Sequence, residues 1–375
     1  MDEKKILIII NALETGGAEN QVANILRLLG EQFEFHVITL LRNDPLFIRN
    51  NINTERVTIH SLNSGKSMLN FPRVFFKMLS LTKKIKPDLI HGVLFQSNIL
   101  SRLLKMFTGI KTVNSVYDIS EEPSFNIFLL RWTNRYADRI FFDNTVGKNN
   151  YVEKRIMRPE QVAYIPNGLG SPEKNIFDET LANELLHRVN FKEGENLWLN
   201  VSRFAIQKDH KTLITAFELL LREFPENKLL LIGDGYLVED IKSFIETKGL
   251  GEKIFYLGRI NDIYTLCRLC GQYVCASAWE GMPIIIMQAM MYRLPVVSTN
   301  VGAIPDLIEN NITGYLCPRR DPAALCAAMK QMLAAGGPGK ESIKEKAFKK
   351  VTEEFSPEKL RENWYNNYIA EINRR

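Results

Sequence analysis

The 375-residue sequence contains no apolar run of about 18 residues or more, which a membrane-spanning helix would need. The apolar stretch Ile6–Ile10 is too short for the core of a signal peptide, and Asn11 and Glu14 follow it closely. A first β-strand is therefore the better interpretation of these residues. The sequence predicts a cytoplasmic protein without a transmembrane helix.

Cysteine is scarce and odd in number, with five residues at positions 267, 270, 275, 317 and 326. The Cys267-x-x-Cys270 pair has the spacing of half a zinc site, but no second Cys or His pair with ligand spacing follows it. Thiols packed in a core, in a reducing compartment, explain the set better than disulfides do. No metal site is predicted.

Motifs of several other classes are missing as well. The chain has no Asp-x-Asp triplet, so a sugar diphosphate held through a metal ion is disfavoured. It has no Gly-x-Gly-x-x-Gly dinucleotide fingerprint. It also lacks a recognisable nucleic-acid module or a basic-aromatic platform, so no nucleic acid partner is expected.

Short β-branched runs alternate with helical patterns, which is typical of parallel sheets with crossover helices. In the first half we predict strands at 5–10, 35–40, 57–61, 89–91, 111–115, 139–143 and 161–165. In the second half we predict strands at 197–201, 228–233, 254–257, 273–276, 296–299 and 314–317. The chain is too long for one ordinary core. The fold class predicted is α/β, with two doubly wound, Rossmann-like domains.

The two strand series set the expected domain boundaries. Residues 1–170 are predicted to form an N-terminal domain and residues 197–354 a C-terminal one. Between them, 171–196 is expected to be a linker with a short helix. Ser356 and Pro357 have the residue types of a helix cap and first turn, so 355–375 is predicted to be a final helix.

Positive charge is concentrated in the first half of the chain. Residues 1–170 hold 22 Lys and Arg against 16 Asp and Glu, and the remaining residues hold 26 against 27. Lys77, Lys83, Lys84 and Lys105 alternate there with Phe, Leu and Met. Such a basic amphipathic pattern suits an anionic membrane surface, and it equally suits a core helix with a solvated charged face. Both interpretations stay open.

The stretch Ser277–Met290, SAWEGMPIIIMQAM, predicts a ligand-binding corner. It has the pattern of a buried strand, a turn at 280–283 and an apolar helix at 284–291. The backbone N–H groups in the first turn of such a helix attract anions.

Glu280-Gly281-Met282-Pro283, followed by Gln288-Ala289-Met290, resembles the signature of the family 4 retaining glycosyltransferases of the GT-B fold. Three further matches occur in the family's order: GGAEN at 16–20, IPNG at 165–168 and SRFAIQKDH at 202–210. The resemblance implies a cleft between two Rossmann-like domains, with the final helix crossing back to the first. It also implies a nucleotide-sugar donor, a metal-independent reaction and retention at the anomeric carbon.

Cations of the expected donor site follow the strand at 197–201. Arg203 and Lys208 are suited to pair with both phosphates of a nucleotide diphosphate, and the resemblance gives them the role of neutralising the leaving group. Glu280 is expected to accept hydrogen bonds from sugar hydroxyls. These three are the candidate catalytic residues.

Other expected donor contacts lie in turns. Gly16 and Gly17 allow the backbone to approach the donor diphosphate or the acceptor closely. The remaining positions match family turns near the donor, its base or its phosphates: Gly233, Asp234, Gly235, Arg259, Ile260, Gly281, Met282, Pro283 and Ile284.

The chain departs from the family pattern at two positions. Gln288 replaces the second acidic residue of the signature and can still bind ribose hydroxyls through its amide. Tyr117, before Asp118, stands where many relatives have histidine. Tyr117, Asp118 and His91 are possible sugar or acceptor contacts, and structural hydrogen bonding is an equally good explanation for His91.

These features predict transfer of a sugar from a nucleotide-diphosphate sugar to an acceptor hydroxyl, in cell-surface polysaccharide or lipid-linked glycan assembly. The expected partners are the donor, a glycan or lipid-linked acceptor and the inner face of the plasma membrane, with no cofactor. Three alternatives remain: a sugar-nucleotide epimerase, a glycan phosphorylase with pyridoxal phosphate, and a non-catalytic nucleotide-sugar-binding protein.

Overall fold

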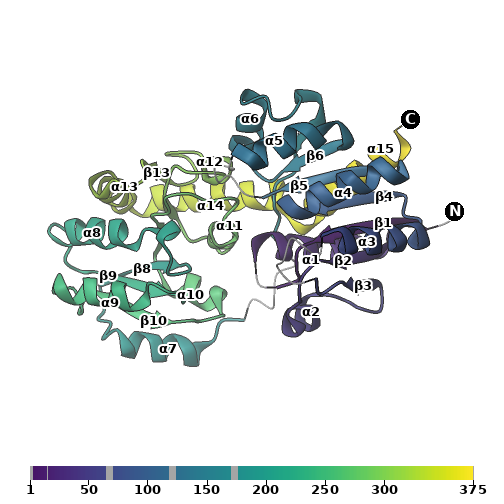
Figure 1. Ribbon diagram of the computed structural model, residues 1–375. Helices are drawn as coiled ribbons and strands as arrows, with labels where there is room; N and C mark the ends of the chain where they lie inside the picture. The colour runs from purple at the N-terminus through teal and green to yellow at the C-terminus, as the bar shows by residue number, and fades with distance from the viewer. Residues whose placement is uncertain (1–2, 15, 65–70, 118–123, 170–175, 375) are drawn as a thin grey trace. The chain divides into compact units, whose positions relative to one another are not determined.

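The computed structural model describes all residues except 1–2, 15, 65–70, 118–123, 170–175 and 375 (Figure 1). The chain divides into two compact units. The first comprises residues 1–170 and 357–375, and the second comprises residues 171–356. None of the described helices combines the length and apolar composition needed to cross a bilayer.

A seven-stranded parallel sheet forms the centre of the first unit, in the order β3-β2-β1-β4-β5-β6-β7. Its strands are β1 (Lys4–Ile10), β2 (Phe33–Thr39), β3 (Val57–Ser61), β4 (Leu89–Val93), β5 (Lys111–Val116), β6 (Arg139–Phe142) and β7 (Val162–Tyr164). Its helices are α1 (Gly17–Leu29), α2 (Pro45–Asn51), α3 (Phe71–Ile85), α4 (Phe95–Thr108), α5 (Ser124–Thr133), α6 (Thr145–Glu153) and α15 (Pro357–Asn373). The strand order reverses between β1 and β4, and ligands of doubly wound sheets bind outside the carboxyl ends of the strands at such a point.

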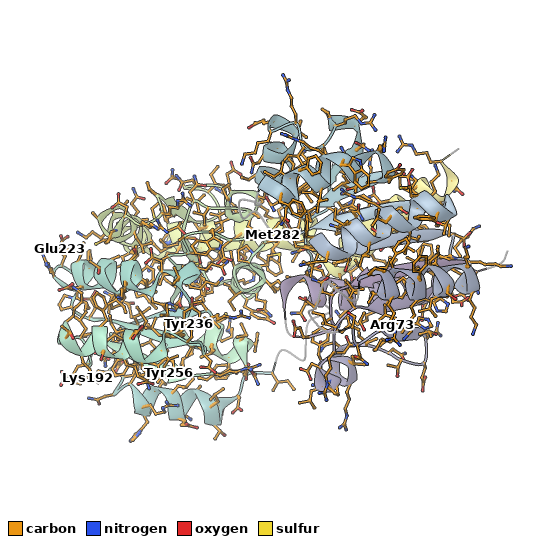
Figure 2. The ribbon with its side chains drawn as sticks, in the orientation of Figure 1. Arg73, Lys192, Glu223, Tyr236, Tyr256 and Met282 are labelled. Atoms are coloured by element: carbon orange, nitrogen blue, oxygen red, sulfur yellow. The ribbon has the colours of Figure 1, made fainter. Side chains whose placement is uncertain are left out.

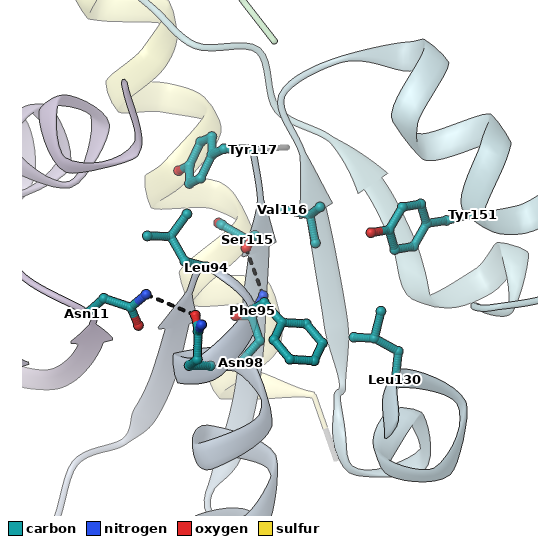
Figure 3. Close-up of a pocket in the computed structure, with 10 residues that line it drawn as sticks. Asn11, Leu94, Phe95, Asn98, Ser115, Val116, Tyr117, Leu130 and Tyr151 are labelled. Atoms are coloured by element: carbon teal, nitrogen blue, oxygen red, sulfur yellow. Dashed lines mark hydrogen bonds between the residues drawn. The ribbon is translucent and has the colours of Figure 1, made fainter. Parts of the chain in front are cut away.

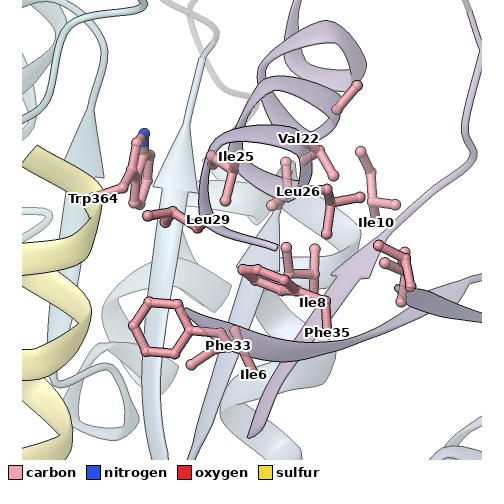
Figure 4. Packing of buried hydrophobic residues seen from close by; sticks show 14 of the residues in the cluster. Ile6, Ile8, Ile10, Val22, Ile25, Leu26, Leu29, Phe33, Phe35 and Trp364 are labelled. Carbon is pink, nitrogen blue, oxygen red and sulfur yellow. The ribbon is translucent and has the colours of Figure 1, made fainter. Parts of the chain in front are cut away.

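The core of the first unit explains the continuous apolar run of its first strand. Side chains of Ile6–Ile10 are buried on both faces of the sheet, as expected for a central parallel strand. Ile6 and Ile8 pack with Phe33, Phe35 and residues of α1 in the cluster of Figure 4. Helix α15 completes this core with Leu360, Trp364 and Tyr368.

His91 belongs to the same core and has a structural environment. Its Nδ1 is hydrogen bonded to the hydroxyl of Tyr368 on α15 (2.7 Å), and its Nε2 to Oγ of Ser115 (2.7 Å). The side chain is completely buried, and burial lowers the pKa of His91 to about 3. The structure therefore favours the structural explanation of His91 over a direct substrate contact.

The second unit contains a six-stranded parallel sheet in the order β10-β9-β8-β11-β12-β13. Its strands are β8 (Asn196–Val201), β9 (Asn227–Ile232), β10 (Ile254–Gly258), β11 (Gln272–Cys275), β12 (Val296–Thr299) and β13 (Tyr315–Cys317). Its helices are α7 (Glu179–Arg188), α8 (His210–Leu221), α9 (Val238–Thr247), α10 (Ile263–Leu269), α11 (Ile284–Met291), α12 (Ile304–Leu307), α13 (Pro322–Ala334) and α14 (Gly336–Glu354). All five cysteines are buried in this unit, and burial raises the pKa of the Cys267 thiol to about 12.

Residues 171–196 were expected to be a linker. Their described residues, 176–196, instead pack within the second unit. Helix α7 contacts α10, and the backbone N–H of Asp178 donates to Oγ1 of Thr265 (2.9 Å). Lys228, from β9, donates to the carbonyl oxygens of Val189 and Asn190 (3.0 and 2.6 Å). These contacts extend the second unit toward the N-terminus of the chain.

Replacing Tyr368 with Phe should lower the free energy of unfolding by about 1–3 kcal/mol, because Nδ1 of the buried His91 would lose its hydrogen-bond partner. Urea denaturation of the purified protein measures the change. Tyr365→Phe is the matched control, since Tyr365 lies on the same helix and is 40% exposed. Equal stability of the two variants would contradict the structural role of the His91–Tyr368 hydrogen bond.

Candidate functional site

The predicted cations lie on the loop between β8 and α8 in the second unit. Arg203 is exposed, and no described residue forms a hydrogen bond or ion pair with its guanidinium. Lys208 ends a short 3₁₀ turn and is mostly buried, with 18% of its side chain exposed. Asp209 follows with a φ of 46° and caps α8 by accepting from the backbone N–H of Thr212 (3.3 Å). The loop therefore has a defined conformation, fixed by the 3₁₀ turn and the Asp209 cap.

Glu280 lies opposite this loop, in the turn after β11, and is almost completely buried. Its Oε1 contacts Nζ of Lys208 and accepts a hydrogen bond from Oγ of Ser277 (2.6 Å). Its Oε2 accepts from Nε2 of Gln207 (3.4 Å). Lys208 and Glu280 were expected to act on different parts of the donor, and the structure joins them in one ion pair.

Side-chain contacts attach the β8–α8 loop to β11 and to the start of α8. Asn200 donates from Nδ2 to the carbonyl oxygen of Val274 (2.8 Å), and Oγ of Ser202 donates to Oδ1 of Asn200 (2.8 Å). The His210 ring stacks on Phe204 with centroids 4.2 Å apart, and its Nε2 is bonded to Oγ of Ser202 (3.0 Å). Burial, with the nearby positive charge of Lys208, lowers the pKa of His210 to about 4. A neutral His210 adds no positive charge to the site at neutral pH.

Glycines 233 and 235 allow the β9 turn to lie directly against the β8 loop. Their φ values are 137° and 155°, and a Cβ at Gly233 would lie 2.0 Å from the carbonyl oxygen of Ser202. A side chain is therefore excluded by both space and backbone conformation. Asp234, between them, accepts from the backbone N–H of Phe204 (2.9 Å) through its carbonyl oxygen. The predicted Gly233-Asp234-Gly235 turn thus shapes the loop that carries Arg203.

The predicted turn at Arg259 and Ile260 follows β10 and is hydrogen bonded to the turn after β9. The carbonyl oxygen of Gly258 accepts from the backbone N–H of Gly233 (2.8 Å), and Tyr256 donates from its hydroxyl to the carbonyl oxygen of Gly233 (3.2 Å). Arg259 is exposed and Ile260 is partly buried. The carboxyl ends of β8, β9 and β10 therefore present one continuous set of turns.

The turn Gly281-Met282-Pro283 leads into α11, as the sequence predicted. Met282 and Pro283 are buried, and the carbonyl oxygen of Gly281 accepts from the backbone N–H of Ala303 (3.1 Å). No side chain caps the first turn of α11, so the N–H groups of Ile284 and Ile285 have no side-chain acceptor among the described residues. Gln288 lies one turn further along α11 and is partly buried.

Several side chains of this site were not found by sequence reasoning. Ser277 and Gln207 both bond to Glu280, and Arg319 donates from Nη1 to the carbonyl oxygen of Ala278 (3.1 Å). Tyr236, labelled in Figure 2, is 70% exposed, and its hydroxyl accepts from the backbone N–H of Ile206 (3.2 Å). The signal for Ser277 and Gln207 was their place inside the two motifs. Tyr236 and Arg319 carried no comparable signal.

A separate pocket of about 190 Å³ lies in the first unit, at the carboxyl ends of β4 and β5 (Figure 3). Asn98 forms part of its floor and donates from Nδ2 to the carbonyl oxygen of Ser115 (2.9 Å). Tyr117 lines the pocket, and its hydroxyl lies near Ser115 without the geometry of a hydrogen bond. Burial raises the pKa of Tyr117, so this side chain stays neutral. Asp118 lies outside the described residues.

Gly16 and Gly17 begin α1, after the first strand. Gly16 is the N-cap residue, and the Glu19 carboxylate lies where a Cβ of residue 16 would be. Burial raises the pKa of Glu19. The carboxyl group of Glu19 therefore fills the space beside Gly16 at this helix start.

Two family models match the chain, one in each unit. Residues 15–169 match Glycosyltransferase Family 4, and residues 183–350 match Glycosyl transferases group 1. A similar solved structure is the HepE protein of Anabaena in complex with UDP, with a TM-score of 0.84 and 17% identity over 98% of this chain and 100% of that one. A glycosyltransferase from Rickettsia africae has a TM-score of 0.85 and 18% identity, with full coverage of both chains.

Sequence relatives agree with this assignment. An Escherichia coli α-1,3-galactosyltransferase acting on GlcNAc-diphosphoundecaprenol is 23% identical, covering 78% of each chain. A Campylobacter jejuni α-1,4-N-acetylgalactosaminyltransferase acting on a diphosphoundecaprenol-linked glycan is 24% identical, covering 98% of this chain and 99% of that one. The two parallel sheets have the GT-B fold of these solved structures, and the two family models identify a glycosyltransferase. The chain belongs to the family 4 glycosyltransferases, which confirms the predicted fold class and family.

Changing Gln288 to Glu should retain or tighten nucleotide binding, because a carboxylate accepts stronger hydrogen bonds from ribose hydroxyls than an amide does. Titration calorimetry with a nucleoside diphosphate measures the affinity. Gln331→Glu, on the exposed face of α13, adds the same charge away from the site and should leave binding unchanged. Complete loss of binding in Gln288→Glu alone would show that Gln288 has another role.

Proposed function

We propose that this glycosyltransferase moves a sugar from a nucleotide-diphosphate sugar to a hydroxyl group of a lipid-linked glycan, with retention at the anomeric carbon. The observation that carries the proposal is the pair Arg203 and Lys208 on the β8–α8 loop, in the same unit as the uncapped start of α11. These are the groups that a departing diphosphate needs. The named relatives that act on diphosphoundecaprenol-linked glycans support the acceptor class.

The proposed reaction breaks the bond between the anomeric carbon and the diphosphate oxygen. The acceptor oxygen forms its bond to the same face of that carbon, and its proton passes to the departing phosphate oxygen. Arg203 and Lys208 stabilise the negative charge that grows on the diphosphate, and Glu280 accepts hydrogen bonds from the sugar. The proposed steps use only these side chains and the two substrates, and they require neither a metal ion nor a cofactor.

Peripheral membrane association forms part of the proposal, on the inner face of the plasma membrane. Lys77, Lys83 and Lys84 are exposed on α3, while Phe75 and Met78 of the same helix are buried. Lys105 does not belong to this exposed set, because its Nζ lies 2.5 Å from Oδ2 of Asp138 and 19% of its side chain is exposed. The three α3 lysines therefore carry the basic face that we propose for anionic lipid.

Two alternative functions can be distinguished from the proposed sugar transfer by simple measurements. A sugar-nucleotide epimerase would change the donor sugar when no acceptor is present, and a binding protein would hold the nucleotide without turnover. Transfer of radiolabelled sugar from a panel of nucleotide-sugars to a lipid-linked acceptor, with product linkage determined by NMR, tests the main proposal directly.

Replacing Arg203 or Lys208 with Ala should lower kcat by two to three orders of magnitude, about 3–4 kcal/mol, because each removes a charge-assisted phosphate contact that strengthens as the bond breaks. Initial rates at saturating donor measure the effect. Lys211→Ala is the control, since Lys211 is an exposed cation at the start of α8. If both site variants keep the wild-type kcat, the diphosphate assignment is wrong.

Adding EDTA should leave most of the activity in place, because Arg203, Lys208 and the α11 amides take the part of a metal ion. The rate of transfer with and without chelator measures this. Activity that disappears with EDTA and returns only with a divalent ion would contradict the metal-independent reaction.

A further inference from the structure

The outer face of α5 carries an exposed aromatic stripe. Phe125, Phe128 and Trp132 are 66%, 63% and 48% exposed. Their spacing of three and four residues places the rings on one side of the helix. The opposite side is packed, since Leu130 and Thr133 are buried. A row of large exposed rings on an otherwise packed helix marks an interaction surface.

Helix α5 is firmly attached beneath this stripe. The completely buried Arg102 of α4 donates from Nη1 to Oγ1 of Thr133 (3.1 Å) and from Nε to Oδ1 of Asn114 (2.6 Å). Arg131 donates from Nη2 to the carbonyl oxygen of Lys154 (2.7 Å), which ties α5 to the segment after α6. The three rings can therefore contact a partner surface while α5 keeps its place in the fold.

Arginines border the stripe. A groove of about 490 Å³ is lined by Arg131, Arg155 and Arg158, with Asn134 and Pro159 among the other lining residues. Arg158 has Glu160 as an exposed partner (3.6 Å), and Arg155 forms no ion pair with any described residue. Residues 124–162 contain seven Arg and Lys against four Asp and Glu. The groove is thus suited to phosphate groups, which guanidinium binds through paired hydrogen bonds.

We propose that the α5 face docks on a bilayer that contains anionic phospholipid, with the three rings in the interfacial region and the arginine groove on the lipid phosphates. Aromatic rings prefer this region, and cations beside them are attracted by the negative surface. This surface differs from the α3 lysines, because it adds apolar insertion to charge. The docking itself does not depend on the proposed function. Only its role does, because docking would bring the enzyme close to a lipid-linked acceptor.

Tryptophan fluorescence tests the insertion directly. Of the four tryptophans, Trp198 and Trp364 are buried, and Trp132 and Trp279 are exposed. Vesicles of phosphatidylcholine and phosphatidylglycerol with brominated chains should quench the wild type and Trp279→Phe but not Trp132→Phe. Equal quenching of the two variants, or no quenching at all, would overturn the proposal. Formation of a dimer through α5 in place of vesicle binding would overturn it as well.

Substitutions then separate the two parts of the surface. F125S/F128S should lower vesicle affinity about a hundredfold, or about tenfold for each ring. R155Q/R158Q should lower it about fivefold for each arginine, and only when phosphatidylglycerol is present. Leu46→Ser is the control, because Leu46 on α2 is 65% exposed and its loss should change nothing. Wild-type affinity of F125S/F128S in vesicle sedimentation, with an unchanged Tm, would overturn the proposal.

Transfer assays keep this result apart from the proposed function. F125S/F128S should transfer sugar normally to a water-soluble acceptor and slowly to one embedded in vesicles. If the wild type binds vesicles through Trp132 but transfers no sugar to either acceptor, the docking surface stands and the proposed function fails.

Discussion

Burial of both faces of two parallel sheets is the constraint on which the rest of this molecule depends. Parallel strands need crossover helices, and those helices cover both faces of the sheet. Groups that bind a ligand can therefore lie only at the ends of the strands. In the second unit the turns after β8, β9 and β10 are joined by backbone hydrogen bonds from Phe204 to Asp234 and from Gly233 to Gly258. Arg203 and Lys208 are therefore carried on a rigid edge rather than on a free loop.

This constraint also explains what the sequence could predict. Strands buried on both faces appear as continuous apolar runs, such as Ile6–Ile10, and the alternation of such runs with helices is enough to identify two Rossmann-like units. Strand ends were less certain: β2 begins at Phe33, two residues before the predicted start. Motif order predicted candidate site residues in both units, because the matched motifs fall where strands end and turns begin.

Contacts between distant residues could not be predicted in the same way. The Lys208–Glu280 pair joins residues 72 positions apart, and the Asp178–Thr265 bond that attaches the expected linker spans 87. The local sequence pattern also does not show which apolar side chains are exposed in the folded protein. Phe125, Phe128 and Trp132 have the spacing of a core stripe, and only the packed structure shows that the core lies on the other side of α5.

The Lys208–Glu280 ion pair restricts how the proposed donor site can bind a phosphate group. A buried carboxylate that loses its cation costs several kcal/mol, so Lys208 cannot simply leave Glu280 for a phosphate. Lysine nevertheless carries three N–H donors, and one ammonium group can contact both Glu280 and a phosphate oxygen. Ser277 and Gln207 continue to satisfy Glu280 as the charge of Lys208 becomes shared. In the proposed reaction Glu280 would therefore orient Lys208 as well as hold the sugar, while Arg203, with no carboxylate partner among the described residues, would give its full charge to the diphosphate.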